Sequence, residues 1–423
     1  MWVVQEAVLA NANECFFAEH EVELRVIMKV AVWFYHKRAF VPEALVNHNG
    51  VFNTITLWYL EEHHNPLNHI DMSLNTLMDF TFRRQSSELR DKVYGILGLT
   101  KYSIKEKKIP ELLHPDYTKP IDRVRQDVTR FIIRESKDLQ FLRFIHHDGD
   151  VGPQPEACSW CAPLTPWLQN GSALVNLPVH YRGIIPSSNA LSEEGALLCT
   201  QDLDTLHLSG VQIGTVAQVS KYLPWKPLHL SSGLETALAE LVTWALTLNS
   251  PMRSIDFRRS LARTLTVGVN LQETPITEQE VDLYEDILGL LLDEYGRPKH
   301  SEDASSPATP EAHQGSFLLM MRAWSSSRKL FSTITGLFGL YVCEKSTVSQ
   351  VFWLTVFRGP GTMRQGDLVV ALCGCKWPVV LRQVGESGKL QMLGAAYVDS
   401  IMNGEAAGKY EKAGDLYTTF IIQ

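Results

Sequence analysis

Two cysteines separated by two residues are the clearest candidates for chemistry in this sequence. Cys158-Ser-Trp-Cys161 has the spacing of a zinc-ligand pair and of a thiol–disulfide redox motif. A structural zinc would need a second such pair, and a redox motif would begin a helix in a βαβ unit. Pro163 and Pro166 follow closely and argue against that helix. We therefore expect two thiols, buried or exposed, with neither role, and keep metal- or thiol-dependent chemistry as the alternative.

Histidines form the other two candidate clusters. Residues 61–64 (Glu-Glu-His-His), together with His69, offer the carboxylates and imidazoles that bind zinc. Adjacent histidines seldom bind one ion together, and no second cluster at ligand spacing supports them, so we expect a polar loop. Residues 146–148 (His-His-Asp) combine a base with a carboxylate that could orient it. Neighbours in sequence seldom point together and no nucleophile is indicated, so a polar loop is again the expectation.

Other catalytic motifs are missing from the sequence. It contains no G-x-S-x-G nucleophile elbow, no P-loop and no G-x-G-x-x-G after a strand. We therefore predict no catalytic, cofactor-binding or metal-ligating residue, and no cofactor. An enzyme of unknown type remains the alternative to a protein that acts by binding.

Length and composition indicate a globular protein. The 423 residues suffice for two or three domains, and 45% apolar with 20% charged residues is typical of a folded chain. The net charge of −8, without a basic stripe, argues against nucleic acid as a partner. No apolar run reaches the ~20 residues of a transmembrane helix, so no membrane span is expected. Seven cysteines and no signal peptide predict reduced thiols in a cytoplasmic protein. The oligomeric state is not indicated.

Hydrophobic periodicity predicts an α+β protein, with mainly helical N-terminal and middle regions and a small antiparallel β C-terminal domain. We expect a helical region over 1–140, a mixed region over 141–296, a flexible Pro/Ser-rich linker over 297–315, and a helix plus small β domain over 316–423.

Helices are expected where apolar residues repeat at intervals of three and four. The predicted helices cover 19–40 (apolar face Val22, Val26, Val30 and Phe34), 51–62, 70–83, a stretch around Val124, Val128, Phe131 and Ile132, 232–245, 277–291 and 317–331. Capping boxes begin two of them, at Ser232 and Thr277. Short strands are predicted over 204–214 with a turn at Gly210, and over 368–373, 379–382, 390–393 and 417–422, as a small sheet or partly closed barrel.

The most informative stretch is Arg90-Asp-Lys-Val-Tyr-Gly-Ile-Leu-Gly-Leu99, followed by Pro115-Asp-Tyr117. Its apolar residues have helical spacing, with a charged first turn and Gly98 as the stop. The stretch resembles the "RDKVYALLGL … PDY" signature of fungal heterokaryon-incompatibility (HET-domain) proteins. We expect its motif positions to be structural. They are Arg90, Asp91, Lys92, Tyr94, Leu97, Gly98, Pro115, Asp116 and Tyr117.

The start of the chain resembles the end of that family's HET domain, which carries W-x-x-Q-E. Trp2, Gln5 and Glu6 match this motif. The resemblance therefore implies a truncated relative, in which most of the HET domain is missing.

The C-terminal region resembles the family over a longer pattern, G-D-x-V, P-x-x-L-R and G-x-x-Y-V-x-x-I-M-x-G-E. The matching positions are Gly366, Asp367, Pro378, Leu381, Arg382, Gly394, Tyr397, Met402, Gly404 and Glu405. Residues 341–358 interrupt the pattern, and we interpret them as a translated intron, which would be an aggregation hazard in a β domain.

Two further segments resemble family elements. Trp160 matches the tryptophan of a P-S-W-x-P-D-W stretch, although the neighbouring Pro and Asp differ here. Phe257–Leu265 resembles an F-x-R-T-L element, whose arginines could bind an anion but are expected on the solvated face of a packed helix.

The family resemblance implies a role in non-self recognition and programmed cell death between unlike hyphae. Such a protein would act through protein partners in the cytoplasm. The missing domain implies an inactive remnant or a regulatory fragment. HET domains resemble TIR-like folds, some of which consume NAD, so that activity, in the missing part, is one form of the enzyme alternative.

Overall fold

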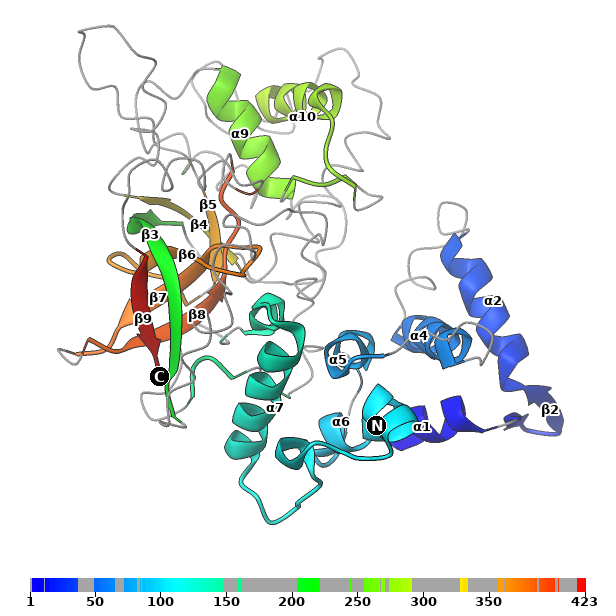
Figure 1. Ribbon diagram of the computed structural model, residues 1–423. Coiled ribbons are helices and arrows are strands. Elements are labelled where there is room, and N and C mark those ends of the chain that lie inside the picture. Colours follow the sequence, from blue (N-terminus) through cyan, green and yellow to red (C-terminus); the bar gives the residue numbers. More distant parts are fainter. Residues whose placement is uncertain are drawn as a thin grey trace, which may run out of the picture. The chain divides into compact units, whose positions relative to one another are not determined.

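The structure is a computed structural model of the 423-residue chain. Its elements belong to two units, residues 1–136 with 164–168 and residues 137–163 with 169–423 (Figure 1). The described residues are 2–10, 12–36, 49–64, 72–81, 84, 86–145, 147, 158–161, 164, 204–220, 244, 255–266, 268–270, 274–290, 328–333, 357–360, 362–385, 388–399, 402 and 417–423.

Helices dominate the first unit. A small antiparallel hairpin is formed by β1 (Glu14–Phe17) and β2 (His20–Glu23). The helices are α1 (Trp2–Leu9), α2 (Leu24–His36), α4 (Asn49–His64), α5 (Leu74–Thr81), α6 (Asp91–Tyr94) and α7 (Ile121–Ser136), with the short turns η2 (Leu97–Leu99), η3 (Tyr102–Glu106) and η4 (Glu111–Leu113).

The helix predicted over 19–40 is shorter than expected. Val22 pairs with Cys15 in the hairpin, so α2 begins only at Leu24. Pairing with β1 satisfies the backbone groups of residues 20–23, which removes them from the helix.

The face that α2 buries also differs from the prediction. Met28 and Ala31 are buried, whereas Val26 and Val30 each remain 48% exposed. The predicted apolar face is wrong at these two valines, because α2 packs against α4 through its other side. Arg25 lies at that contact and pairs with the carboxylates of residues 61 and 62.

Three predicted helices of this unit are present. The helices expected over 51–62 and 70–83 correspond to α4 and α5. Residues 61–64 lie in the last turn of α4, so the polar loop predicted there is wrong. In α7 the predicted stripe of Val124, Val128 and Ile132 is buried. Phe131 is half-buried, with its ring 5.4 Å from that of Tyr102.

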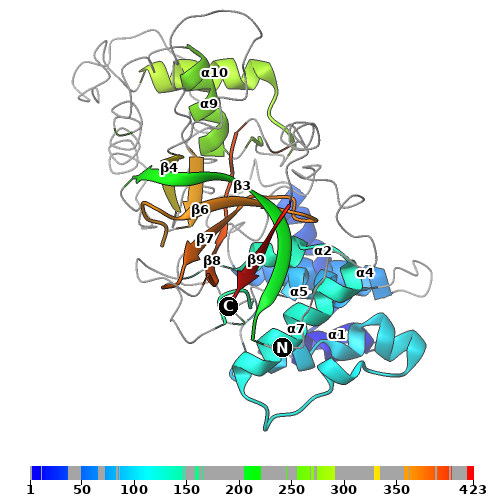
Figure 2. The ribbon, with the colours of Figure 1, turned by 60° about the vertical axis from the view of Figure 1, so that its left-hand side comes forward.

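The second unit is built on one mixed sheet of seven strands, in the order β5-β4-β3-β6-β7-β8-β9. Because β9 also pairs with β3, the strands β3, β6, β7, β8 and β9 close into a barrel, and β4 and β5 extend it from the far end of β3 (Figures 1 and 2). The elements are η5 (Gln140–Phe144), β3 (Leu206–Val219), α9 (Ile255–Thr266), α10 (Glu278–Leu290), β4 (Arg328–Thr333), β5 (Phe357–Pro360), β6 (Leu368–Leu372), β7 (Val379–Gln383), β8 (Leu390–Ala395) and β9 (Thr418–Ile422).

The turn predicted at Gly210 is wrong, because β3 runs through it as one long, curved strand (Figure 2). Residues 206–210 pair with β9, and residues 210–215 pair with β6. A Cβ at Gly210 would lie 2.5 Å from the carbonyl oxygen of Ala371, so only glycine permits this approach of two backbones. Gly210 is thus the corner at which β3 changes partner and closes the barrel.

The core of the barrel is apolar and fully enclosed. It is made by Ile213, Val216, Phe331, Met363, Val369, Ala371, Cys373, Val380, Leu393, Ala396 and Val398. Together with the helices, this largely antiparallel sheet confirms the predicted α+β class.

Several predicted segments are wholly or partly outside the described residues. They are the helix at 232–245 (apart from Trp244), the linker at 297–315, most of the helix at 317–331 and the insert up to 356. Residues 328–331 belong to strand β4, so the helix predicted there is wrong at its end. The last residues of the insert, Phe357 and Arg358, begin β5. The predicted division into four regions stays a prediction.

Candidate functional site

The signature stretch is held by the first helix of the chain. The side-chain Oε1 of Gln5 accepts a hydrogen bond from the backbone N–H of Gly98, at 3.1 Å. A Cβ at Gly98 would lie 2.5 Å from the Gln5 side chain, so the contact requires glycine at that position. The structure thus joins two family motifs that lie 93 residues apart. Glu6, on the same helix, is exposed, and Trp2 begins the helix.

The stretch does not form the single helix expected from its spacing. Helix α6 ends at Tyr94, and Gly98 lies inside the turn η2 rather than at a stop. Val93, Leu97 and Leu99 are nevertheless buried.

The two halves of the signature contact each other directly. Tyr117 donates its hydroxyl to Asp91 Oδ1 at 2.6 Å, which raises the pKa of Tyr117 to about 12. The ring of Tyr94 lies edge-on to that of Tyr117, and its hydroxyl donates to the Asp116 carbonyl at 3.3 Å. Arg90 completes the contact, since its Nε donates to the backbone of residue 119 at 2.9 Å. The signature is therefore one folded cluster.

Asp116 also fixes the turn that carries Tyr117. Its Oδ1 accepts hydrogen bonds from the N–H and hydroxyl of Thr118, and these bonds lower the pKa of the Asp116 carboxyl. Pro115, just before, is exposed and fixes the local backbone.

Lys92 is the one buried cation of the signature. It is 3% exposed, and its Nζ donates to the carbonyl of Arg84. Burial, assisted by the Arg84 charge, lowers the pKa of Lys92 to about 8. Burial likewise lowers the pKa of Arg84 to about 10. This part of the molecule therefore holds two positive charges at a desolvation cost.

The C-terminal motif contains a buried ion pair inside the barrel unit. Arg382 donates from Nε and a terminal nitrogen to the two carboxylate oxygens of Asp367, both at 2.8 Å. The same terminal nitrogen reaches the Thr362 carbonyl at 2.8 Å, and the N–H of Arg364 donates to Asp367 Oδ2. Asp367 and Arg382 are 2% and 8% exposed. This bidentate pair ties strand β7 to the turn before β6.

The other C-terminal motif positions shape the barrel backbone. Gly366 has φ +91° and Gly394 has φ 143°, conformations that favour glycine. The carbonyl of Pro378 accepts the N–H of Ala396 at 2.8 Å. Leu381, Tyr397 and Met402 are buried, whereas Gly404 and Glu405 lie outside the described residues.

The cysteine pair forms a disulfide, which corrects the prediction of reduced thiols for these two residues. Cys158 and Cys161 have Cα atoms 5.7 Å apart. In this state neither sulfur is a thiolate available to a metal. Cys373 and Cys375, which are free, are buried, and burial raises their pKa values to about 11 and about 12.

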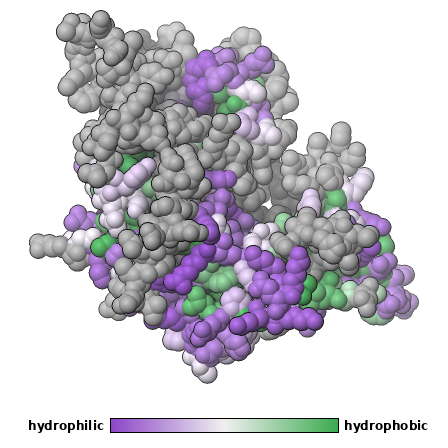
Figure 3. Space-filling view, viewed as in Figure 1, coloured by the Kyte–Doolittle hydropathy of each residue, from purple (hydrophilic) through white to green (hydrophobic). Residues whose placement is uncertain are grey.

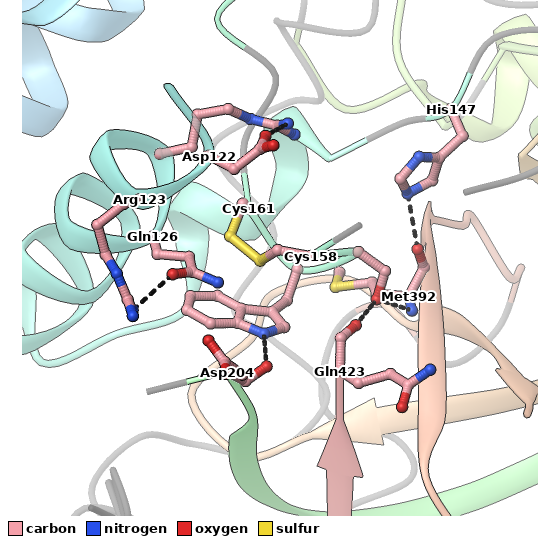
Figure 4. Close-up of a disulfide and its surroundings, with 12 residues drawn as sticks. Asp122, Arg123, Gln126, His147, Cys158, Cys161, Asp204, Met392 and Gln423 are labelled. Carbon is pink, nitrogen blue, oxygen red and sulfur yellow. Dashed lines mark hydrogen bonds and ion pairs between the residues drawn. A yellow bond between two sulfur atoms is a disulfide. The ribbon is translucent and has the colours of Figure 1, made fainter. Parts of the chain in front are cut away.

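The segment between the two cysteines binds strand β8, the residue after β9 and a residue just before β3 (Figure 4). Ser159 Oγ donates to the Gln423 carbonyl and accepts the Met392 N–H at 2.9 Å, and its own N–H donates to the same Gln423 carbonyl at 3.0 Å. Trp160, fully buried, donates its Nε1 to the carbonyl of Asp204 at 3.4 Å. Sequence reasoning missed this role of Ser159, because its partners lie more than 230 residues away.

The histidine and arginine candidates have structural partners. His147 Nε2 lies 2.9 Å from the carbonyl oxygen of Met392, whereas His146 and Asp148 lie outside the described residues. The α9 arginines pair with carboxylates of α10, as in Arg263 with Glu278 at 2.7 Å, so they form a helix contact instead of an anion site. The predicted capping box of α10 is present, since Thr277 and Glu280 bond each other's backbone N–H groups.

Within the part of the chain that the structure describes, no three His, Cys, Asp or Glu side chains are placed to hold a metal ion. Among the same residues, no helix is long and apolar enough to cross a membrane. Among the motif positions, Gln5, Asp91 and Arg382 each bind a residue from another segment of the chain.

Comparison with known proteins finds a likeness for part of the barrel unit. The family model of the Het-6 beta-barrel domain matches residues 333–418. This segment begins at the last residue of β4, contains β5 to β8 and ends at the first residue of β9. No curated protein and no solved structure matches the chain. Residues 333–418 are thus similar to the Het-6 beta-barrel domain, which confirms the predicted resemblance to fungal heterokaryon-incompatibility proteins.

Proposed function

We propose that the chain acts in heterokaryon incompatibility, as a cytoplasmic protein of non-self recognition whose output is cell death. The match of residues 333–418 to the Het-6 beta-barrel domain carries this proposal. The motif positions support a binding role, because the signature cluster and the Asp367–Arg382 pair build rigid scaffolding.

An exposed apolar surface on the first unit supports contacts with protein partners. Val26, Val30 and Trp33 follow one another at intervals of four and three on α2, and are 48%, 48% and 55% exposed. The opposite side of α2 is already buried through Met28 and Ala31. A contiguous apolar surface that stays exposed beside a buried one is typical of a site that binds another protein. We call Val26, Val30 and Trp33 the α2 stripe.

The neighbouring hairpin adds aromatic and acidic side chains. Phe16 and Phe17 are 73% and 80% exposed. In Figure 3, apolar atoms lie at the surface among polar ones where Figure 1 draws α1 and β2. The exposed carboxylates of the hairpin are Glu14, Glu19, Glu21 and Glu23. We infer that the occupant of the α2 stripe is a protein segment with apolar and basic side chains.

Forced hyphal fusion tests the proposed function. A strain that expresses the chain is fused with a panel of natural isolates and with its own parent, and uptake of a vital dye by fused cells is measured. We expect dye uptake in some pairings with isolates and none with the parent. The proposal is wrong if deletion of the gene leaves dye uptake unchanged in every pairing.

The partner surface is tested in the same assay by Val30→Ser with Trp33→Ser. Lys29→Ser, at an exposed polar position of the same helix, is the matched control. We expect the double variant to abolish cell death and the control to retain it, with circular dichroism unchanged in both. Full activity of the double variant would remove the α2 stripe from the proposal.

A further inference from the structure

The junction of β8 and β9 is the weak seam of the barrel. The two strands run parallel and are in register at one pair, Leu390 with Ile422, where the Gln423 N–H donates to the Leu390 carbonyl at 2.9 Å. The β7–β8 pairing, by comparison, joins five residue pairs. The β8–β9 seam thus has few backbone hydrogen bonds of its own.

Ser159 closes this seam from outside the sheet. Its hydroxyl accepts the Met392 N–H of β8 and donates to the carbonyl of Gln423, just after β9 (Figure 4). One side chain therefore bridges the two strands at the point where their own hydrogen bonding ends. We call this bridge the Ser159 clasp.

The position of Ser159 depends on the disulfide. Cys158 and Cys161 flank the Ser-Trp pair and close it into a four-residue loop. The backbone N–H of Ser159 and the indole of the fully buried Trp160 bind Gln423 and Asp204 from the same loop. With the two bonds of the Ser159 hydroxyl, this short loop makes four hydrogen bonds to the barrel, which together depend on its backbone conformation.

We propose that Cys158–Cys161 is a thiol–disulfide switch that controls the Ser159 clasp. In the oxidised state the loop holds β8 and β9 together. In the reduced state the loop samples other conformations, Ser159 leaves the seam, and the β8–β9 junction opens while β9 remains paired with β3.

The reductant is a dithiol, and the exchange balances within that class. A thiolate of the dithiol attacks Sγ of Cys158 and expels the thiolate of Cys161. The attack is placed at Cys158 because this residue is 9% exposed, whereas Cys161 is 0% exposed. The second thiol of the dithiol then attacks the mixed disulfide, forms a cyclic disulfide and releases the Cys158 thiolate. Two electrons and two protons pass from the dithiol to the cysteine pair.

The two free cysteines of the barrel unit do not compete for this exchange. Cys373 and Cys375 are buried, and their raised pKa values of about 11 and about 12 keep them as thiols at neutral pH. The described part of the chain therefore offers one exchangeable disulfide.

Hydrogen exchange on the full chain, followed by mass spectrometry, tests the switch. Peptides over 388–395 and 417–423 report the seam, and peptides over β6 and β7 serve as the internal reference. For a loop of four residues, loss of the cross-link corresponds to about a 20-fold change in the opening equilibrium. We expect dithiothreitol to accelerate seam exchange by about that factor and to leave the reference unchanged.

Three variants sharpen the result. Cys158→Ala with Cys161→Ala should exchange fast at the seam with or without dithiothreitol. Ser159→Ala should exchange fast at 388–395 even with the disulfide intact, which separates the clasp from the cross-link. Cys15→Ala, at a free and partly exposed cysteine, should respond as the natural chain does.

Three outcomes would overturn the proposal. The first is seam exchange unchanged within twofold after mass spectrometry shows full reduction, which would leave a purely structural disulfide. The second is a disulfide that dithiothreitol reduces only after denaturation. The third is an isolated protein without this disulfide. The comparison with and without dithiothreitol uses the natural chain, so it decides the matter even if a variant does not fold.

Discussion

Replacing Arg382 by methionine should open the sheet around β7. The substitution keeps an unbranched apolar stem but removes the guanidinium that binds both carboxylate oxygens of Asp367. Asp367 is 2% exposed, so its charge would remain buried with the Arg364 N–H as its remaining partner among these contacts. The carbonyl of Thr362 would lose its hydrogen bond from Arg382 as well.

The expected cost follows from the burial of this pair. Removing one partner of a buried ion pair costs about 3–5 kcal/mol, because the other charge is left uncompensated. Domains are stable by roughly 5–15 kcal/mol, so this loss would be a large share of the stability of the barrel. A loss of about 3–5 kcal/mol would make the β6 and β7 amides exchange roughly 150 to 5,000 times faster than in the natural chain.

Hydrogen exchange is the appropriate assay because the chain has two units. A single unfolding transition would mix their stabilities, whereas peptides over 368–372 and 379–383 report the barrel alone. Arg364→Met is the matched control, since the Arg364 side chain is exposed and only its backbone N–H binds Asp367. The control should change the free energy of opening by less than about 0.5 kcal/mol.

A double-mutant cycle completes the test. Asp367→Asn removes the charge and leaves an amide oxygen that can still accept the Arg364 N–H. Combined with Arg382→Met, it should cost less than the sum of the two single changes, because no buried charge is then left unpaired. The reasoning is refuted if Arg382→Met costs under about 1 kcal/mol, or if the two single costs simply add.

Other contacts yield further expected outcomes. Gly98→Ala should displace the Gln5 side chain and lower the stability by about 1 kcal/mol, the same as Gln5→Ala. The double variant should lose no more stability than either single variant, as measured by hydrogen exchange of peptides over 90–100. Additive losses would contradict the contact. Lys92 has a pKa of about 8 in the folded chain against an ordinary 10.5, so its charge opposes folding most below pH 8, and this opposition fades as the pH rises toward 10.5. In denaturant titrations the natural chain should therefore gain stability relative to Lys92→Met between pH 8 and pH 10.5. Parallel pH profiles of the two proteins would contradict the burial of this charge. Gly210→Ala should cost more than about 2 kcal/mol of stability, because the added Cβ pushes β3 away from β6. Gly388→Ala is the control, since its Cβ meets nothing within 4 Å, although its φ of +70° adds about 1 kcal/mol of strain. Hydrogen exchange of β6 peptides measures both costs, and equal costs would contradict the close approach at Gly210. If residues 341–358 are a translated intron, sequencing of the transcript should find a message that lacks them, and a message that keeps them throughout would remove that interpretation.

Local sequence patterns were sufficient where an element is stabilised by its own neighbours. The spacing of Val124, Val128 and Ile132 predicted the buried side of α7, because every third or fourth residue of a helix lies on one face. The capping box at Thr277 and Glu280 was also predictable, since both partners lie within one turn.

Local patterns failed where distant segments compete for the same residues. Val22 has helical spacing with Val26, yet pairing with Cys15 places it in a strand. Gly210 by itself indicates a turn. Strands β6 and β9, from the C-terminal part of the chain, nevertheless hold β3 extended on both sides of it.

The sequence by itself determined the family resemblance, the α+β class and most helices of the first unit, because these depend on composition, motif order and short-range periodicity. Only the tertiary structure decided which motif residues contact one another. Gln5 meets Gly98, Asp367 meets Arg382, and Ser159 joins β8 to the residue after β9. Contacts across 15 to 264 residues depend on how strands and helices pack, and that packing has no local signature in the chain.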